Sequence, residues 1–238
     1  MLDLYFWPTP NGYKISILLE ELGLEYNVMP VHIGKGEQFR PEFLAISPNN
    51  KIPALVDHDG PGGTSYALFE SAAIMLYLCE KTGSDLLPSD TRARHDVMQW
   101  LMFQSSGVGP MLGQAHHFRK YAPQQIQYAI DRYTNEATRL YKVIDRRLKD
   151  ARYLGGDTYS VADIATYPWL RPHKWQGQTL DDYPHLLRWY EEVRARPAVQ
   201  RGLAVLGEKI DRSGAKPSGE RWDNLFGKNQ LEKSGKGD

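Results

Sequence analysis

The segment Lys51-Ile52-Pro53-Ala54-Leu55 places a proline at the start of an apolar strand. An X–Pro peptide bond prefers the trans form by only about 0.5–1 kcal/mol, so a cis bond is tolerated at such a place. If Ile52–Pro53 is cis, the main-chain N–H and C=O of Ile52 face solvent instead of a neighbouring strand. They can then pair antiparallel with the main chain of a bound molecule. The segment therefore predicts a site for a short, peptide-like ligand, with Pro53 in a structural role.

A polar pair, Glu70-Ser71, lies about twenty residues further along the sequence, between an apolar strand and a helical run that begins at Ala72. The first N–H groups of a helix have no partners within it, and together with a hydroxyl they suit a carboxylate. The pair therefore predicts the site for a carboxylate end of the same ligand. The plainer alternative is an ordinary helix cap beside an edge strand that begins with proline.

Together, Asn50-Lys51-Ile52-Pro53-Ala54-Leu55 and Phe69-Glu70-Ser71 resemble the glutathione site of the glutathione transferase superfamily. The resemblance implies that the main chain of Ile52 holds the cysteinyl unit of glutathione and that Glu70 and Ser71 hold its γ-glutamyl end. The run Thr9-Pro10-Asn11-Gly12-Tyr13-Lys14-Ile15, taken with Ser47-Pro48-Asn49-Asn50-Lys51-Ile52-Pro53, makes the protein similar to the Nu class. The likeness continues through Gly109-Pro110-Met111-Leu112-Gly113-Gln114 and Tyr128-Ala129-Ile130-Asp131-Arg132-Tyr133. This class is a bacterial branch related to a yeast nitrogen regulator.

Likeness to the Nu class implies a homodimer that reduces disulfide bonds with glutathione and uses no cysteine of its own. Glutathione would be the co-substrate, with one or two molecules per site, and no metal is implied. The site residues that the likeness implies are Thr9, Asn11, Gln38, Lys51, Ile52, Glu70, Ser71 and Arg132. Two other functions fit the same residues: conjugation of electrophiles or reduction of organic hydroperoxides, and a non-catalytic glutathione-binding regulatory module.

The loop after the first strand supplies candidate donors for a glutathione thiolate, namely the Thr9 hydroxyl, the Asn11 amide and nearby main-chain N–H groups. Lowering a thiol pKa from about 8.5 to about 6.5 takes roughly 2.7 kcal/mol, which two or three aimed hydrogen bonds supply. These neutral groups also tolerate a neutral disulfide, so Thr9 and Asn11 are the catalytic candidates. Tyr5 is the alternative donor, although its place in the strand equally fits a packing role.

Cys79 is the only cysteine, so the sequence has no C-x-x-C motif and no internal disulfide framework. Its apolar helical surroundings favour a small buried hydrophobe, and its isolation fits a reducing compartment. His116 and His117 do not indicate a metal site, because adjacent helical residues diverge by about 100° and no third ligand is spaced to join them.

The composition indicates which partners and which cellular compartment to expect. The 238 residues carry 29 Lys and Arg against 29 Asp and Glu, and this balance gives no electrostatic footprint for nucleic acid or an anionic membrane. The N-terminus lacks a basic, apolar leader, and no run approaches the roughly eighteen apolar residues of a membrane span. We expect a cytoplasmic protein that binds glutathione and small disulfides, with no nucleic-acid or membrane partner.

These residues require a scaffold of two domains. Residues 1–83 predict an α/β, thioredoxin-like domain with the order βαβ then ββα: a strand at 2–6, a helix closed by Gly23, a strand near 26–31, a helical turn near 41–44 and a hairpin broken at 59–63. Residues 84–91 predict a linker and 92–211 an all-helical domain. The segment 212–238, rich in Lys, Gly and Ser, predicts a tail that is either mobile or docked by Trp222 and Phe226.

Several local signals organise the helical domain. An apolar stripe that steps by three and four residues predicts one long amphipathic helix; its members are Ile126, Ile130, Tyr133, Ala137, Leu140, Ile144 and Leu148. Ser160 and Asp163 match a capping box and take a structural role. Gly107, Gly109 and Pro110 predict that the preceding helix ends or bends. Pro184 and Pro197 mark the starts of further helices.

Overall fold

The computed structural model describes residues 1–210 and 215–233, and its contacts form two compact units. The first unit comprises Met1–Met75 together with Arg201–Asp238, and the second comprises Leu76–Gln200. The described part of the C-terminal segment therefore packs with the N-terminal residues, which is the docked alternative that the sequence left open for the tail. Residues 211–214 and 234–238 lie outside the described residues.

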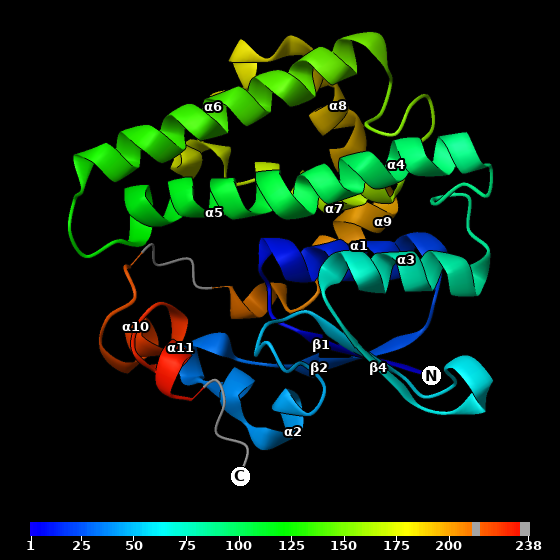
Figure 1. Ribbon diagram of the computed structural model, residues 1–238, viewed down its shortest axis with the longest axis horizontal. Coiled ribbons are helices and arrows are strands. Elements are labelled where there is room, and N and C mark those ends of the chain that lie inside the picture. The colour runs from blue at the N-terminus through cyan, green and yellow to red at the C-terminus, as the bar shows by residue number, and fades with distance from the viewer. Residues whose placement is uncertain (211–214, 234–238) are drawn as a thin grey trace. The chain divides into compact units, whose positions relative to one another are not determined.

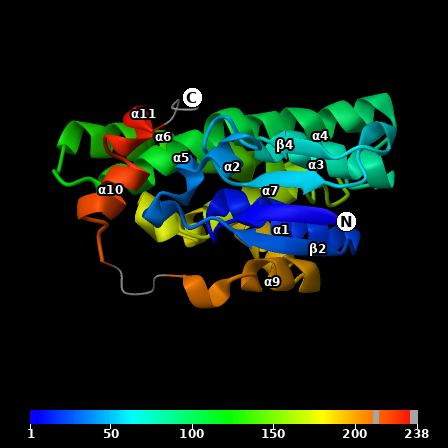
Figure 2. The same cartoon turned by 90° about the horizontal axis from the view of Figure 1, so that it is seen from below.

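The first unit is built on a four-stranded mixed sheet in the order β2-β1-β3-β4. Its strands are β1 (Leu2–Phe6), β2 (Tyr26–Pro30), β3 (Ala54–Asp57) and β4 (Tyr66–Phe69). Strand β1 pairs parallel with β2 and antiparallel with β3, and β3 pairs antiparallel with β4. The helices of this unit include α1 (Pro10–Leu22), α2 (Pro41–Leu44), α10 (Gly219–Leu225) and α11 (Asn229–Glu232). Figures 1 and 2 show α1 lying along the sheet, so the predicted thioredoxin-like order is confirmed.

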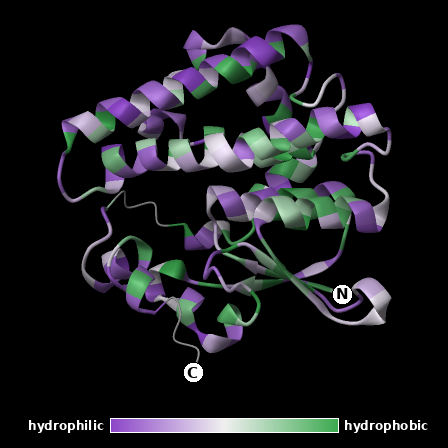
Figure 3. Cartoon of the chain, in the orientation of Figure 1, coloured by the Kyte–Doolittle hydropathy of each residue, from purple (hydrophilic) through white to green (hydrophobic). Residues whose placement is uncertain are grey.

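The sequence patterns explain these elements. Leu2, Leu4 and Phe6 of β1 are buried, and the alternating residues Asp3 and Tyr5 are half-buried, as the period of a strand requires. Helix α1 begins after Thr9 and ends at Gly23, whose φ of 63° is the left-handed conformation that glycine adopts without strain. In Figure 3, hydrophobic residues concentrate on the helix labelled α3 in Figure 1, whereas hydrophobic and hydrophilic residues alternate along α6.

The second unit is helical. Its main helices are α4 (Thr91–Phe103), α5 (Gly109–His116), α6 (Gln127–Asp150), α7 (Val161–Leu170) and α8 (Pro184–Arg194), while α3 (Ser71–Thr82) and α9 (Pro197–Ala204) each cross a unit boundary. Two π-helical turns, Gln104–Val108 and His117–Tyr121, flank α5. The backbone therefore passes the predicted break at Gly107 through a widened turn. Pro184 and Pro197 begin helices, as predicted.

Helix α6 carries the predicted stripe, with one correction. Ala137, Leu140, Ile144 and Leu148 are buried, but Ile126 is 46% exposed. Ile126 occupies the N-cap position, outside the first helical turn. Its side chain therefore does not share the packed face of the helix, although it stands at the predicted spacing.

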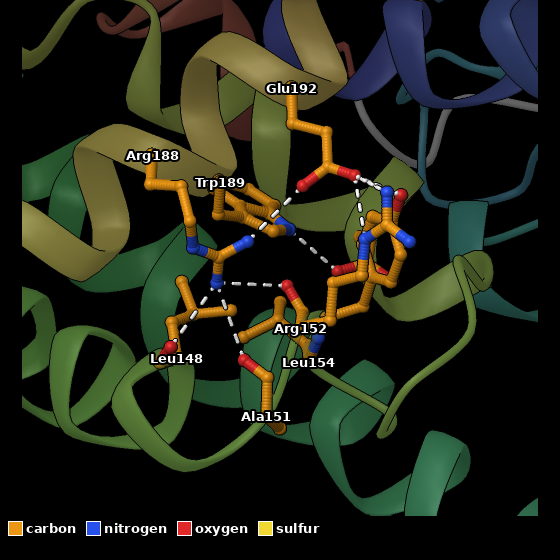
Figure 4. A network of polar contacts seen from close by, with 9 residues as sticks. Leu148, Ala151, Arg152, Leu154, Arg188, Trp189 and Glu192 are labelled. Atoms are coloured by element: carbon orange, nitrogen blue, oxygen red, sulfur yellow. Dashed lines mark hydrogen bonds and ion pairs between the residues drawn. The ribbon is translucent and has the colours of Figure 1, made fainter.

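The C-terminal end of α6 is held by a side chain from α8 (Figure 4). Arg188 Nη2 donates hydrogen bonds of 3.1–3.3 Å to the carbonyl oxygens of Leu148, Ala151 and Arg152. Its Nη1 donates to Glu192 Oε2 at 3.2 Å. The last carbonyls of a helix lack partners within it, so one guanidinium satisfies acceptors that would otherwise depend on solvent.

Asp163 organises the start of α7. Its fully buried carboxylate forms the capping box with Ser160 and accepts hydrogen bonds from the main-chain N–H of Leu154 at 2.9 Å and from Trp189 Nε1 at 2.7 Å. Burial raises its pKa to about 6, although these hydrogen bonds act to lower it. The box therefore ties together three segments of the second unit.

Within residues 1–210 and 215–233, no helix is long and apolar enough to span a membrane.

Candidate functional site

The strand pairing of the first unit brings the predicted site segments to one edge of the sheet. Strands β1 and β3 are antiparallel, with Tyr5 opposite Ala54, so the end of β1 lies beside the start of β3. Strands β3 and β4 are also antiparallel, with Ala54 opposite Phe69. The loop after β1, the residues before β3 and the residues after β4 therefore share this edge. These three segments contain six of the proposed site residues, namely Thr9, Asn11, Lys51, Ile52, Glu70 and Ser71, whereas Gln38 and Arg132 lie elsewhere in the chain.

The start of β3 presents main-chain groups at this edge. The peptide bond Ile52–Pro53 is cis. None of the described residues hydrogen-bonds to the main-chain N–H or C=O of Ile52. The side chain of Ile52 is partly buried against a cluster formed by Val31, Phe43 and Ala54. The side chain therefore anchors the residue while its main chain stays available to pair with a peptide.

The end of β4 forms a polar corner at the start of α3. Glu70 has a φ of 70°, a left-handed conformation that is uncommon for a residue with a side chain. Its carbonyl oxygen accepts the N–H of Ile74 at 3.0 Å, so Glu70 begins the helix while its side chain is exposed. Backbone strain of this kind persists only where the surroundings impose it, and it concentrates at ligand sites.

Ser71 has a buried partner, Lys14, that no motif in the sequence indicated. Lys14 on α1 is 3% exposed, and its Nζ donates to Ser71 Oγ at 3.3 Å. Burial lowers the pKa of Lys14 to about 7, and the charge of Glu70 acts in the opposite direction. When it is protonated, Lys14 gives this corner a positive potential that suits a carboxylate. The signal available in the sequence was that Lys14 stands four residues before Leu18 on the apolar face of α1.

The start of α1 carries the two catalytic candidates. The Thr9 Oγ1 accepts a hydrogen bond from the main-chain N–H of Gly12 at 3.2 Å and caps the helix. This leaves the hydroxyl hydrogen free to be donated elsewhere. Asn11 is half-buried in the first turn. Both residues lie at a helix N-terminus, where the helix dipole favours a negative charge such as a thiolate.

Tyr5, the alternative donor, lies in an apolar environment. Its ring packs against Phe43 with centroids 6.0 Å apart, and it borders the same cluster as Ile52. Burial raises the pKa of its hydroxyl, and the nearby charge of Asp3 adds to this effect. These contacts support the packing role for Tyr5.

Two further predicted binding residues, Gln38 and Lys51, contact the C-terminal segment. Gln38 is 2% exposed, and its Nε2 donates to the main-chain oxygen of Asn224 at 3.0 Å. Lys51 Nζ donates to Gln230 Oε1. No pattern in the sequence pointed to these contacts, because the hydrophobic residues of the segment singled out Trp222 and Phe226.

The remaining candidates belong to the second unit. Arg132 is exposed on α6, and its role toward glutathione stays a prediction. Cys79 is buried and free, and desolvation by burial raises its pKa to about 12. His116 lies between the rings of Tyr121 and Trp175, with centroids 4.8 and 4.9 Å away. The described ranges contain no group of three or more His, Cys, Asp or Glu side chains able to hold a metal ion.

The sequence matches the N-terminal domain of glutathione S-transferase over residues 1–80 and its C-terminal domain over residues 109–197. The disulfide-bond oxidoreductase YfcG of Escherichia coli strain K12 is 54% identical over 214 residues, which cover 88% of this chain and 98% of that protein. A glutathione transferase of Pseudomonas putida, solved with one glutathione disulfide per subunit, has a TM-score of 0.82 at 45% identity, and the match covers 87% of this chain and 92% of that one. A Pseudomonas fluorescens family member with two glutathione bound has a TM-score of 0.81 at 45% identity, covering 85% and 92%. The chain therefore belongs to the glutathione S-transferase family.

Proposed function

We propose that this protein is a glutathione-dependent disulfide-bond reductase that uses the thiolate of bound glutathione as its nucleophile. The observation that carries the proposal is the burial of Cys79, whose pKa is raised to about 12. A thiol in this state supplies almost no thiolate at neutral pH, so the reacting sulfur must come from the ligand. The 54% identity to an oxidoreductase named for disulfide bonds supports this reaction over conjugation.

The first unit supplies the groups that would hold glutathione. The open main chain of Ile52 pairs with the cysteinyl unit, and Glu70 and Ser71 hold the γ-glutamyl end above Lys14. This arrangement directs the cysteinyl sulfur toward the start of α1. There Thr9 and Asn11 stabilise the thiolate by hydrogen bonds, and the helix dipole adds to their effect. Gln38, Lys51 and Arg132 are the further proposed contacts to glutathione.

The reaction consists of two thiol–disulfide exchanges. The glutathione thiolate attacks one sulfur of the substrate disulfide, which forms a mixed disulfide and releases the other half as a thiolate that takes up a proton. A second glutathione thiolate then attacks the glutathione sulfur of the mixed disulfide and releases the second thiol. Two glutathione molecules are oxidised to glutathione disulfide, and the two electrons reduce the substrate to two thiols.

The broader setting is proposed on the same basis. We place the protein in the cytoplasm as a homodimer, with glutathione and small disulfides as its ligands. We propose no metal and no nucleic-acid or membrane partner, in line with the balanced charge of the protein.

Side-by-side assays test the reaction. With glutathione present, we expect turnover of hydroxyethyl disulfide to exceed that of a chloro-dinitrobenzene electrophile and of cumene hydroperoxide. The variant Cys79→Ala should keep full disulfide turnover, because its thiol takes no part. Loss of turnover in a folded Cys79→Ala protein would overturn the mechanism. Glutathione binding without turnover in any assay would instead favour a regulatory module.

A further inference from the structure

The C-terminal segment 215–233 lies on two residues that are proposed to bind glutathione. Its helices α10 and α11 follow the last matched family domain, which ends at residue 197. The main-chain oxygen of Asn224 accepts the Nε2 hydrogen of Gln38, and Gln230 Oε1 accepts a hydrogen of the Lys51 ammonium. Two carbonyl oxygens of the segment therefore accept hydrogen bonds from two donors of the first unit.

Asn224 holds the segment in this place. It is fully buried, its Nδ2 donates to the main-chain oxygen of Gly34 at 3.1 Å, and its Oδ1 accepts from Asn229 Nδ2 at 2.7 Å. A Cβ atom on Gly36 would lie 3.1 Å from Asn224 Oδ1, so the glycine permits this close approach. Asn224 is therefore held by hydrogen bonds on both sides of its amide and by close packing against Gly36.

The two carbonyl oxygens accept hydrogen bonds from the two donors that the proposed function assigns to glutathione. Glutathione has two carboxylates, and the corner at Ser71 and Lys14 accounts for the γ-glutamyl one. The other, at the glycine end, would find its donors in Lys51 and Gln38. A carboxylate accepts a stronger, charge-assisted hydrogen bond from an ammonium than a neutral amide oxygen does.

The closed arrangement also leaves polar groups imperfectly satisfied. Gln38 Oε1 is buried and, among the described residues, has no hydrogen-bond partner. Lys51 is exposed, partial desolvation lowers the pKa of its ammonium, and the Gln230 side chain that it contacts on the segment is a neutral amide. A ligand that brings an anion to Lys51 and lets Gln38 rearrange therefore has an advantage over the segment.

We propose that residues 215–233 form a strap that competes with the glycine carboxylate of glutathione for Lys51 and Gln38. This inference rests on the proposed function. The strap closes over these donors when the site is empty and releases them when glutathione binds. The strap is thereby a determinant of glutathione affinity, and it leaves the sulfur chemistry at Thr9 and Asn11 unchanged.

Titration calorimetry with reduced glutathione tests the strap. A protein truncated after residue 214 should bind glutathione about tenfold more tightly than the full-length protein. Gln230→Ala removes the acceptor for Lys51 and the amide that donates to the main-chain oxygen of Asn224, and it should bind about threefold more tightly. The matched control is Ser218→Ala, because Ser218 is exposed on the same segment and its hydroxyl makes no capping hydrogen bond. Its affinity should equal that of the full-length protein.

Glutathione esterified at the glycine carboxylate separates competition from simple obstruction. The ester has no carboxylate to compete with the strap, so truncation should change its affinity by less than twofold. An equal gain for ester and glutathione would show obstruction alone and overturn the inference. Trypsin adds an independent readout, because saturating glutathione should speed cleavage at Arg221 and Lys228 in the full-length protein.

The outcomes distinguish the two proposals. Binding of glutathione with the same affinity to the full-length protein, to the truncated protein and to Gln230→Ala would overturn the strap and leave the proposed function intact. Failure of every folded variant to bind glutathione would overturn the proposed function and the strap together. Because Gln230→Ala alters a single residue, it decides the matter even if the truncated protein does not fold.

Discussion

The ammonium of Lys14 lies 3.3 Å from the hydroxyl of Ser71 and joins α1 to the start of α3 across 57 residues of sequence. Lys14 is 3% exposed, and burial lowers its pKa from 10.5 to about 7. A charged lysine in this position costs free energy, and the placing of Lys14 beside Ser71 and Glu70 fits a site that attracts a carboxylate.

Replacing Lys14 should change stability in a pH-dependent way. Between pH 7 and 10.5 the unfolded state holds a proton on Lys14 that the folded state has lost, so this group makes stability rise with pH in that window. Lys14→Met should therefore raise the free energy of unfolding by about 1–3 kcal/mol at pH 6 and by much less at pH 10. Urea unfolding at both pH values measures this, with the exposed Lys35→Met as control. A gain that is constant with pH would contradict it.

Substitutions of Asn11 and Tyr5 should have different effects on disulfide turnover. If Asn11 stabilises the thiolate, Asn11→Ala should lower disulfide turnover at saturating glutathione by tenfold or more, which is about 1.4 kcal/mol or above. Tyr5→Phe should keep turnover within about twofold, because the ring contact with Phe43 remains. Steady-state rates with hydroxyethyl disulfide decide the matter. The reverse pattern would make Tyr5 the donor.

The sequence predicted the fold because it depends on local signals, and the order of the strands then brings the proposed site segments to one edge of the sheet. The alternation in β1, the cap at Gly23 and the Ile52–Pro53 start of β3 each follow from one short run of residues. The positions of Thr9, Glu70 and Ser71 at one sheet edge then follow from the order of the strands. The order of the elements alone was sufficient for these features.

The contacts that the sequence missed join residues far apart in the protein. Lys14 meets Ser71 across 57 residues, and Gln38 meets Asn224 across 186. A buried lysine and a polar anchor run against the expectation that hydrophobic residues dock a segment, which led to Trp222 and Phe226 instead. Periodicity reports which face of an element is apolar, and it does not report which polar group on another element will satisfy a buried one.

The left-handed backbone of Glu70 predicts that a glycine variant at this position is more stable than an alanine variant. At ordinary positions of regular structure, glycine is less stable than alanine by about 0.5–1 kcal/mol. At a φ of 70° the side chain strains the backbone, so Glu70→Gly should be more stable than Glu70→Ala by about 1 kcal/mol. Thermal unfolding compares them. Both lose the carboxylate, so both should weaken glutathione binding alike. An alanine variant as stable as the glycine one would contradict the strained conformation.

Asp163 should control the stability of the second unit. Its carboxylate accepts from the main-chain N–H groups of Leu154 and Ser160 and from the indole of Trp189. An amide turns one acceptor into a donor that faces these donors, so Asp163→Asn should lower the free energy of unfolding by about 3 kcal/mol. The exposed Asp157→Asn is the matched control and should change it by less than about 0.5 kcal/mol.

The pKa of Asp163 determines how the loss of unfolding free energy in Asp163→Asn depends on pH. The folded state keeps the Asp163 proton up to a pKa of about 6, whereas the unfolded state releases it near 3.8. The folded state therefore binds more protons between these values, and the contribution of Asp163 to stability falls as the pH rises from 4 to 6. The difference in unfolding free energy between the parent protein and Asp163→Asn should be larger at pH 4.5 than at pH 7.5. Urea titrations at the two pH values test this, and a larger difference at pH 7.5 would show that the hydrogen bonds outweigh burial and hold the pKa of Asp163 below its ordinary value.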